Sequence, residues 1–198
     1  MNRKLWPNLL SATRIALMPA VLGSAIAGSR VWFTVLIAVS LATDALDGYF
    51  ARRFHAFSEL GRKLDSAADY VTLVTGVTGI ALLWPEIMRR ELPWVVTGMV
   101  SFFAVIIYGF IRLGHAPCYH TWASKTGAVV CPVTLVPLLN EWTAVPFHLT
   151  ILWLVLTGIE EIAISLVVPR HVGEMPTLWH AVRARRGRVR AGGAGSAE

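Results

Sequence analysis

Long uncharged runs of apolar residues are the feature that most constrains how this chain folds. Each run approaches the roughly 20 residues that a helix needs to cross the hydrocarbon core of a bilayer. The six runs occupy residues 15–29, 31–43, 70–85, 92–111, 126–140 and 142–159. Only 15% of the 198 residues are charged, whereas about a quarter are charged in soluble domains. The sequence therefore predicts an all-α, polytopic membrane protein with six transmembrane helices.

We expect these helices to form one catalytic domain in residues 1–182, followed by a basic and then Gly/Ala-rich cytosolic tail without ordered structure in residues 183–198. The expected spans are 9–28, 31–53, 64–84, 94–113, 125–140 and 147–168. The first span has an alternative interpretation as a signal peptide, because Ala25-Ile26-Ala27 resembles a cleavage site. Arg14 and Pro19 interrupt the apolar stretch of that peptide, so a retained helix is favoured.

Basic residues are distributed unevenly between the two sides of the predicted bundle. With a cytosolic N-terminus, fifteen of the eighteen Lys and Arg residues fall in or beside cytosolic segments, and only Arg30, Arg89 and Arg90 fall in outside turns. Because cytosolic loops of membrane proteins carry an excess of Lys and Arg, both termini are predicted to lie in the cytosol. The net charge of +6 then reflects orientation and contact with anionic lipids, and no nucleic-acid partner is expected.

Four aspartates are concentrated in one short window, although acidic residues are scarce in this chain. Asp44 and Asp47 are three residues apart near the cytosolic end of the second span, and Asp65 and Asp69 are four apart near the start of the third. Spacings of three and four place each pair on one face of a helix. Because the connection between the two spans is short, the helices are expected to be antiparallel neighbours whose four carboxylates converge.

Carboxylates in this position need cations. Asp44 lies about nine residues inside the predicted helix end, a depth of roughly 13 Å. Intramembrane carboxylates are costly and usually line a functional cavity. Two of them 4 Å apart repel by about 4 kcal/mol at an effective dielectric constant near 20. Oxygen-rich clusters suit Mg²⁺ or Mn²⁺, and the alternative is a set of interhelical salt bridges to Arg52, Arg62 and Lys63.

The aspartates belong to a longer pattern that resembles a family signature. The stretch Asp44-x-x-Asp47-Gly48-x-x-Ala51-Arg52 is followed, after eight residues, by Gly61-x-x-x-Asp65-x-x-x-Asp69. All eight defining residues of the CDP-alcohol phosphotransferase (CDP-alcohol phosphatidyltransferase) family signature are present at accepted spacing, and the six-helix arrangement agrees along about 160 residues. Asn8, Ser11 and Arg14 resemble the beginning of that family's first helix.

The resemblance implies an enzyme of phospholipid synthesis. Such an enzyme transfers a substituted phosphate from a CDP-linked donor, here CDP-diacylglycerol, to an alcohol and releases CMP. By similarity, Asp44, Asp47 and Asp65 would hold two divalent ions, Mg²⁺ or Mn²⁺, with Asp69 completing the site and acting as the general base. The residues expected to contact the donor are Asp44, Gly48, Ala51, Arg52 and Gly61.

The distribution of basic residues predicts an integral protein of the cell membrane whose active site faces the cytosol. The resemblance also implies a homodimer. The acceptor is left open among glycerol 3-phosphate, serine, inositol phosphate, choline and another lipid. One departure bears on it, because the glycerol-phosphate-using branch reads Asp-Pro-x-Ala-Asp-Lys where this chain has Ser66 and Tyr70 at the Pro and Lys positions. Arg112 and Lys125 either bind an anionic acceptor or only extend toward the interface.

Glu160 and Glu161, late in the sixth span, are expected to form a structural pair with Arg170 or Arg112.

Two other classes of membrane protein use carboxylates in helices. An aspartate-rich prenyltransferase binds diphosphates through Mg²⁺, but its motifs lie far apart in sequence, whereas the four aspartates here lie within 26 residues. A cation or proton transporter predicts a repeated half or interrupted helices around a midplane site, and neither is evident in the sequence. The phosphotransferase interpretation is therefore favoured over both.

Overall fold

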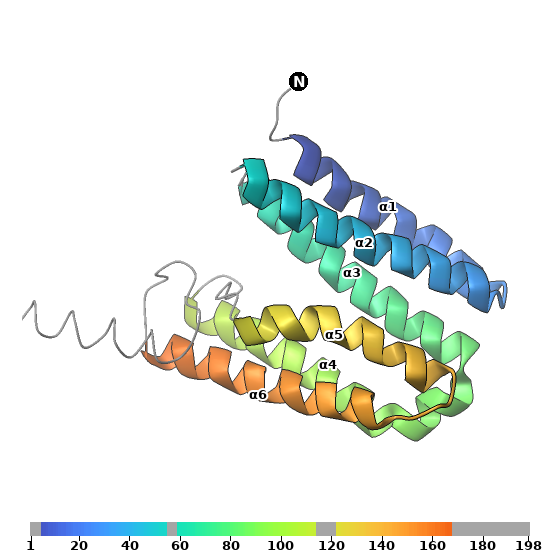
Figure 1. The fold of residues 1–198 in the computed structure, drawn as a ribbon. Coiled ribbons are helices and arrows are strands. Elements are labelled where there is room, and N and C mark those ends of the chain that lie inside the picture. The colour runs from blue at the N-terminus through green and yellow to red at the C-terminus, as the bar shows by residue number, and fades with distance from the viewer. Residues whose placement is uncertain (1–4, 55–58, 114–121, 168–198) are drawn as a thin grey trace, which may run out of the picture. The chain divides into compact units, whose positions relative to one another are not determined.

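The computed structural model describes residues 5–54, 59–113 and 122–167, and these residues are all-helical apart from short turns. The six helices are α1 (Leu5–Ile26), α2 (Arg30–Phe54), α3 (Glu59–Leu83), α4 (Pro85–Leu113), α5 (Trp122–Leu139) and α6 (Val145–Val167) (Figure 1). Each uncharged run of the sequence lies mainly in one of them. The predicted tail, residues 183–198, lies outside the described residues.

Helix α4 begins nine residues before the predicted span, which corrects one expectation. Arg89 and Arg90 were expected in an outside turn, but both lie inside this helix. The physical reason is a favourable helix start, because Pro85 supplies a fixed φ at the first position and Glu86 places a negative charge in the first turn. Glu86 also pairs with Arg89, with 3.1 Å between Oε1 and NH2.

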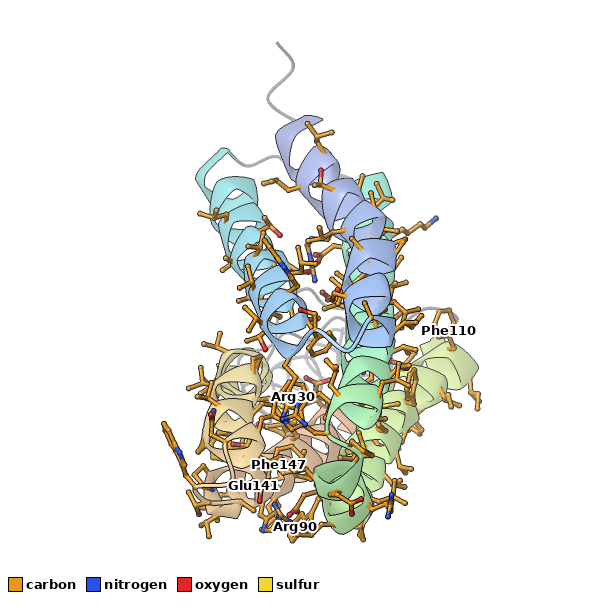
Figure 2. The ribbon with its side chains drawn as sticks, turned by 90° about the vertical axis from the view of Figure 1, so that its right-hand side faces the viewer. Arg30, Arg90, Phe110, Glu141 and Phe147 are labelled. Atoms are coloured by element: carbon orange, nitrogen blue, oxygen red, sulfur yellow. The ribbon has the colours of Figure 1, made fainter. Side chains whose placement is uncertain are left out.

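Four of the described helices are long and apolar enough to cross a membrane. The stretches are Leu9–Ile26 in α1, Lys63–Leu83 in α3, Pro85–Ile111 in α4 and Val145–Ile164 in α6. Helix α2 carries Arg and Asp residues toward its C-terminal end, and α5 contributes only the shorter apolar stretch Val129–Leu139. Large apolar side chains such as Phe110 are exposed on the surface (Figure 2). The chain therefore has the helices of an integral membrane protein, and the count of six spans stays a prediction.

The helices form two compact units, residues 1–89 and 90–198. In the first unit α1 packs against both α2 and α3, and the three helices run side by side (Figure 1). The buried face of α1 follows alternating steps of three and four residues, which is the spacing of one helix face. Its members are Ser11, Arg14, Met18, Val21 and Ala25.

The buried face of the first unit changes from polar to apolar along its length. Its apolar end is a cluster of Met18, Val21, Ala25, Phe33 and Leu83. Gly79 in α3 makes room for this cluster, because a Cβ at that position would overlap the Phe33 ring.

Arg30, labelled in Figure 2, links α2 to the end of α3 at the apolar end of the first unit. Its Nε and NH2 donate to the Leu83 carbonyl oxygen at 3.1 and 2.8 Å. Its guanidinium carbon lies 5.0 Å from the ring centroid of Trp84, within the range of a cation–π contact.

In the second unit, α6 contacts both α4 and α5. Glu91 of α4 is buried and lies 2.6 Å from His148 Nε2 of α6. The His148 ring stacks on Trp94 with centroids 4.3 Å apart. Helices α5 and α6 approach closely at Gly127, where a Cβ would overlap the Leu154 side chain.

The packing of Gly79 yields a first prediction. Gly79→Ala is expected to lower the free energy of unfolding by about 1–3 kcal/mol, the usual cost of overpacking, because the Phe33 ring that the methyl group overlaps is itself buried. Thermal unfolding of the detergent-solubilised protein, followed by circular dichroism, measures the change.

Gly76→Ala is the matched control in the same helix, since nothing lies within 4 Å of a Cβ added there. Alanine favours a helix over glycine by about 0.5–1 kcal/mol, so this variant is expected to be at least as stable as the parent. Equal stability of both variants would contradict the packing of Phe33 against Gly79.

Candidate functional site

Three of the four aspartates meet at the polar end of the first unit. Asp44 lies toward the end of α2, and Asp65 and Asp69 lie near the beginning of α3. Because α2 and α3 follow one another in opposite directions, these two helix ends are neighbours. One carboxylate oxygen from each of the three residues lies within 4.8 Å of the others.

A buried arginine from α1 joins the three carboxylates. Arg14 NH1 donates to Asp44 Oδ1 at 2.5 Å, and NH2 donates to Asp69 Oδ1 at 2.8 Å. NH1 also lies 3.5 Å from Asp65 Oδ1. The same guanidinium therefore links all three helices of the unit.

The two sides of this cluster differ in exposure. The Arg14 side chain is 2% exposed, whereas those of Asp44, Asp65 and Asp69 are 43%, 48% and 49% exposed. The guanidinium lies on the buried side of the cluster and the carboxylates reach the surface. The three carboxylates are therefore partly accessible from outside the unit.

The charge and chemistry of the cluster fit a divalent cation. Three carboxylates and one guanidinium carry three negative charges and one positive charge, a net charge of −2. Carboxylate oxygens are the ligands that Mg²⁺ and Mn²⁺ prefer. Ligand atoms within 4.8 Å of one another lie close enough to share one ion. The cluster could therefore bind a metal, and the donor set favours a hard cation.

The remaining predicted site residues fall in three places. Gly61 lies in the first turn of α3 and is partly buried. Four residues lie in α2 after Asp44, but their side chains are outside the described part of the structure; they are Asp47, Gly48, Ala51 and Arg52. In the second unit, Arg112 in α4 and Lys125 in α5 likewise have side chains outside the described part. Glu160 and Glu161 are partly buried in α6.

Arg14 is the residue whose contacts the sequence analysis missed. In the sequence, Arg14 interrupts an apolar stretch and belongs to the family resemblance, and neither feature predicts its partners. The available signal was its charge, because an arginine within a membrane-spanning stretch needs a partner. Its three partners lie 30, 51 and 55 residues away in the sequence.

Comparison with known proteins gives a family match over most of the chain. A family model described as CDP-alcohol phosphatidyltransferase matches residues 4–167. The cardiolipin synthase (CMP-forming) of Streptomyces coelicolor is 34% identical over 117 residues, 56% of this chain and 54% of that protein. No solved structure matches this chain.

Two further relatives are named CDP-diacylglycerol–glycerol-3-phosphate 3-phosphatidyltransferase. That of Aquifex aeolicus is 37% identical over 65 residues, 33% of this chain and 36% of that protein. That of Rickettsia bellii is 30% identical over 112 residues, 50% of this chain and 60% of that protein. The matched region thus spans between about a third and three fifths of these relatives.

Proposed function

The chain belongs to the CDP-alcohol phosphatidyltransferase family, and we propose that it transfers a phosphatidyl group from CDP-diacylglycerol to an alcohol with release of CMP. The observation that carries this proposal is the convergence of Asp44, Asp65 and Asp69 in one open acidic cluster. These residues hold three of the four aspartate positions in the family signature. The family match includes these residues, and their closeness suits a shared metal ion, which supports the proposal.

The acidic cluster is proposed to hold the enzyme's divalent cations. Asp44, Asp47, Asp65 and Asp69 would be the ligands, and Mg²⁺ or Mn²⁺ suits their oxygen atoms. Two bound divalent cations would neutralise the donor diphosphate and stabilise the oxygen that leaves with CMP. The protein's own part is to hold the carboxylates in one place and to keep their outer side open.

Asp69 is proposed as the general base. Its carboxylate is 49% exposed, and it lies one helical turn after Asp65 in the N-terminal half of α3. The acceptor hydroxyl oxygen bonds to the phosphorus of the phosphatidyl group while the bond from that phosphorus to the CMP oxygen breaks. The hydroxyl proton passes to Asp69, and CMP leaves with the bonding electron pair.

The residues around the acidic cluster are proposed to bind the donor nucleotide. Gly48, Ala51 and Gly61 have little or no side chain, so the donor can approach the backbone closely. Arg52 is proposed to hold a phosphate, because its planar guanidinium pairs well with phosphate oxygens. The distribution of basic residues supports an active site that opens to the cytosol, with six spans and both termini on that side.

The names of the relatives narrow the choice of acceptor. Cardiolipin carries two phosphatidyl groups on one glycerol, so its synthesis with CMP release requires phosphatidylglycerol as the acceptor. We propose phosphatidylglycerol here, because the S. coelicolor cardiolipin synthase is similar over 56% of this chain. Ser66 and Tyr70, which depart from the glycerol-phosphate-using pattern, support the same choice.

Glycerol 3-phosphate is the second candidate acceptor, and the Aquifex and Rickettsia relatives favour it. Arg112 and Lys125 are proposed to contact the phosphate of either acceptor. As in the family resemblance, we expect the protein to be a homodimer in the bilayer.

Removal of the carboxylates or of the metal tests the site. Purified protein is expected to release CMP from CDP-diacylglycerol only with Mg²⁺ or Mn²⁺ and an alcohol acceptor. Asp69→Asn is expected to lower turnover by at least 10²-fold, the lower range for general base catalysis, while donor binding is largely kept. Asp44→Asn is expected to weaken metal binding. CMP release measures turnover, retained radiolabelled donor measures donor binding, and the Mn²⁺ concentration that activity requires measures metal binding.

Glu86→Gln is the matched control, because it also removes one carboxylate charge but at an exposed position that pairs with Arg89. It is expected to keep full activity. Full activity of Asp69→Asn or of the parent in excess chelator would rule out the proposed site.

A separate assay tests the acceptor. Vesicles with CDP-diacylglycerol and phosphatidylglycerol are expected to yield cardiolipin and CMP in equal amounts, whereas vesicles with soluble glycerol 3-phosphate yield little CMP. Thin-layer chromatography of the lipid product distinguishes the two reactions. CMP release with glycerol 3-phosphate alone would reverse the order of the two candidates.

A further inference from the structure

Arg14 places a permanent positive charge inside the acidic cluster. It is almost fully buried, and it contacts one oxygen atom of each of Asp44, Asp65 and Asp69. Those three carboxylates are also the residues that offer ligand atoms to a metal ion. The Arg14 guanidinium and a bound metal ion would therefore interact with the same three carboxylates.

We propose that Arg14 is the internal counter-cation of this site and that a divalent cation competes with it for the carboxylates of Asp44, Asp65 and Asp69. The inference rests on the proposed metal site and adds a residue that tunes its affinity. Arg14 would make the helix bundle stable before metal binds, because it relieves the repulsion between the carboxylates. The same charge would weaken metal binding, because like charges repel across the shared carboxylates.

A second observation supports the proposal that Arg14 can exchange its carboxylate contacts for other hydrogen bonds. Three polar atoms in the first unit are buried without a hydrogen-bond partner among the described residues: Arg14 Nε, Ser40 Oγ and Thr72 Oγ1. Buried polar groups are normally paired, so this group calls for an explanation.

Ser40 and Thr72 belong to α2 and α3, the helices that carry the aspartates, and both are buried. Ser40 precedes Asp44 by four residues in α2, and Thr72 follows Asp69 by three residues in α3. Because α2 and α3 are antiparallel, both positions lie about one helical turn further from the polar end. Hydroxyl oxygens accept hydrogen bonds from a guanidinium. They would offer Arg14 acceptors when its hold on the carboxylates is weakened by a metal ion.

Direct measurement of metal binding tests this competition without using activity. Parent protein, Arg14→Gln and Arg14→Lys are reconstituted in nanodiscs and titrated with Mn²⁺, and free Mn²⁺ is measured by electron paramagnetic resonance. Arg14→Gln is expected to bind Mn²⁺ more tightly, by on the order of tenfold, because one opposing charge is removed from partly screened carboxylates. Arg14→Lys keeps the charge but not the forked contact with two carboxylates, so its affinity is expected to lie between the other two.

Thermal unfolding provides the second readout. In chelator, Arg14→Gln is expected to unfold at a lower temperature than the parent, and saturating Mn²⁺ is expected to restore most of the loss. A merely structural role for Arg14 predicts the same loss in both conditions.

Arg30→Gln is the matched control, since its guanidinium bonds a backbone carbonyl and contacts Trp84 instead of an aspartate. It is expected to lose the same stability with and without Mn²⁺ and to bind Mn²⁺ as the parent does.

The outcomes separate this inference from the proposed function. Mn²⁺ binding by the parent together with equal or weaker binding by Arg14→Gln overturns the competition and leaves the metal site in place. Absence of Mn²⁺ binding in both proteins overturns both proposals. If Arg14→Gln does not fold even in Mn²⁺, the Mn²⁺ affinity of Arg14→Lys is the test. A Mn²⁺ affinity of Arg14→Lys equal to or below that of the parent overturns the inference.

Discussion

The ion pairs between Arg14 and the aspartates are the interaction on which the first unit depends. An unpaired charge in a low-dielectric interior is costly by several kcal/mol, so a buried guanidinium requires its partners. Those partners come from α2 and α3, and Arg14 itself comes from α1. The requirement therefore fixes which faces of the three helices meet and how the helices are aligned at this end.

The apolar end of the unit complements this polar end. Phe33 packs into the space left by Gly79, and Arg30 bonds the last carbonyl group of α3. These contacts hold α2 and α3 together without using the aspartates. The carboxylates can therefore remain partly exposed, which a site for a cation and a phosphate-bearing substrate requires.

Sequence reasoning succeeded where the signal is local. Uncharged runs identify helices because a helix that crosses a bilayer is predominantly apolar, and each run lies mainly in one described helix. Spacings of three and four residues placed Asp65 and Asp69 on one face of a helix, in agreement with their common contact with Arg14. It failed at the start of α4, where charged residues resembled a turn. Glu91 in that segment is instead buried against His148, 57 residues away.

The sequence by itself determined the helical class, the family signature and the chemistry of its aspartates, because residue type and spacing along one helix suffice for these. The tertiary structure decided that these aspartates pair with the Arg14 guanidinium and which side of their carboxylates is exposed. Spacing within a helix defines a face but not the neighbour that the face contacts. Arg14 and its three partners lie on three different helices, so only the packing of those helices could bring them together.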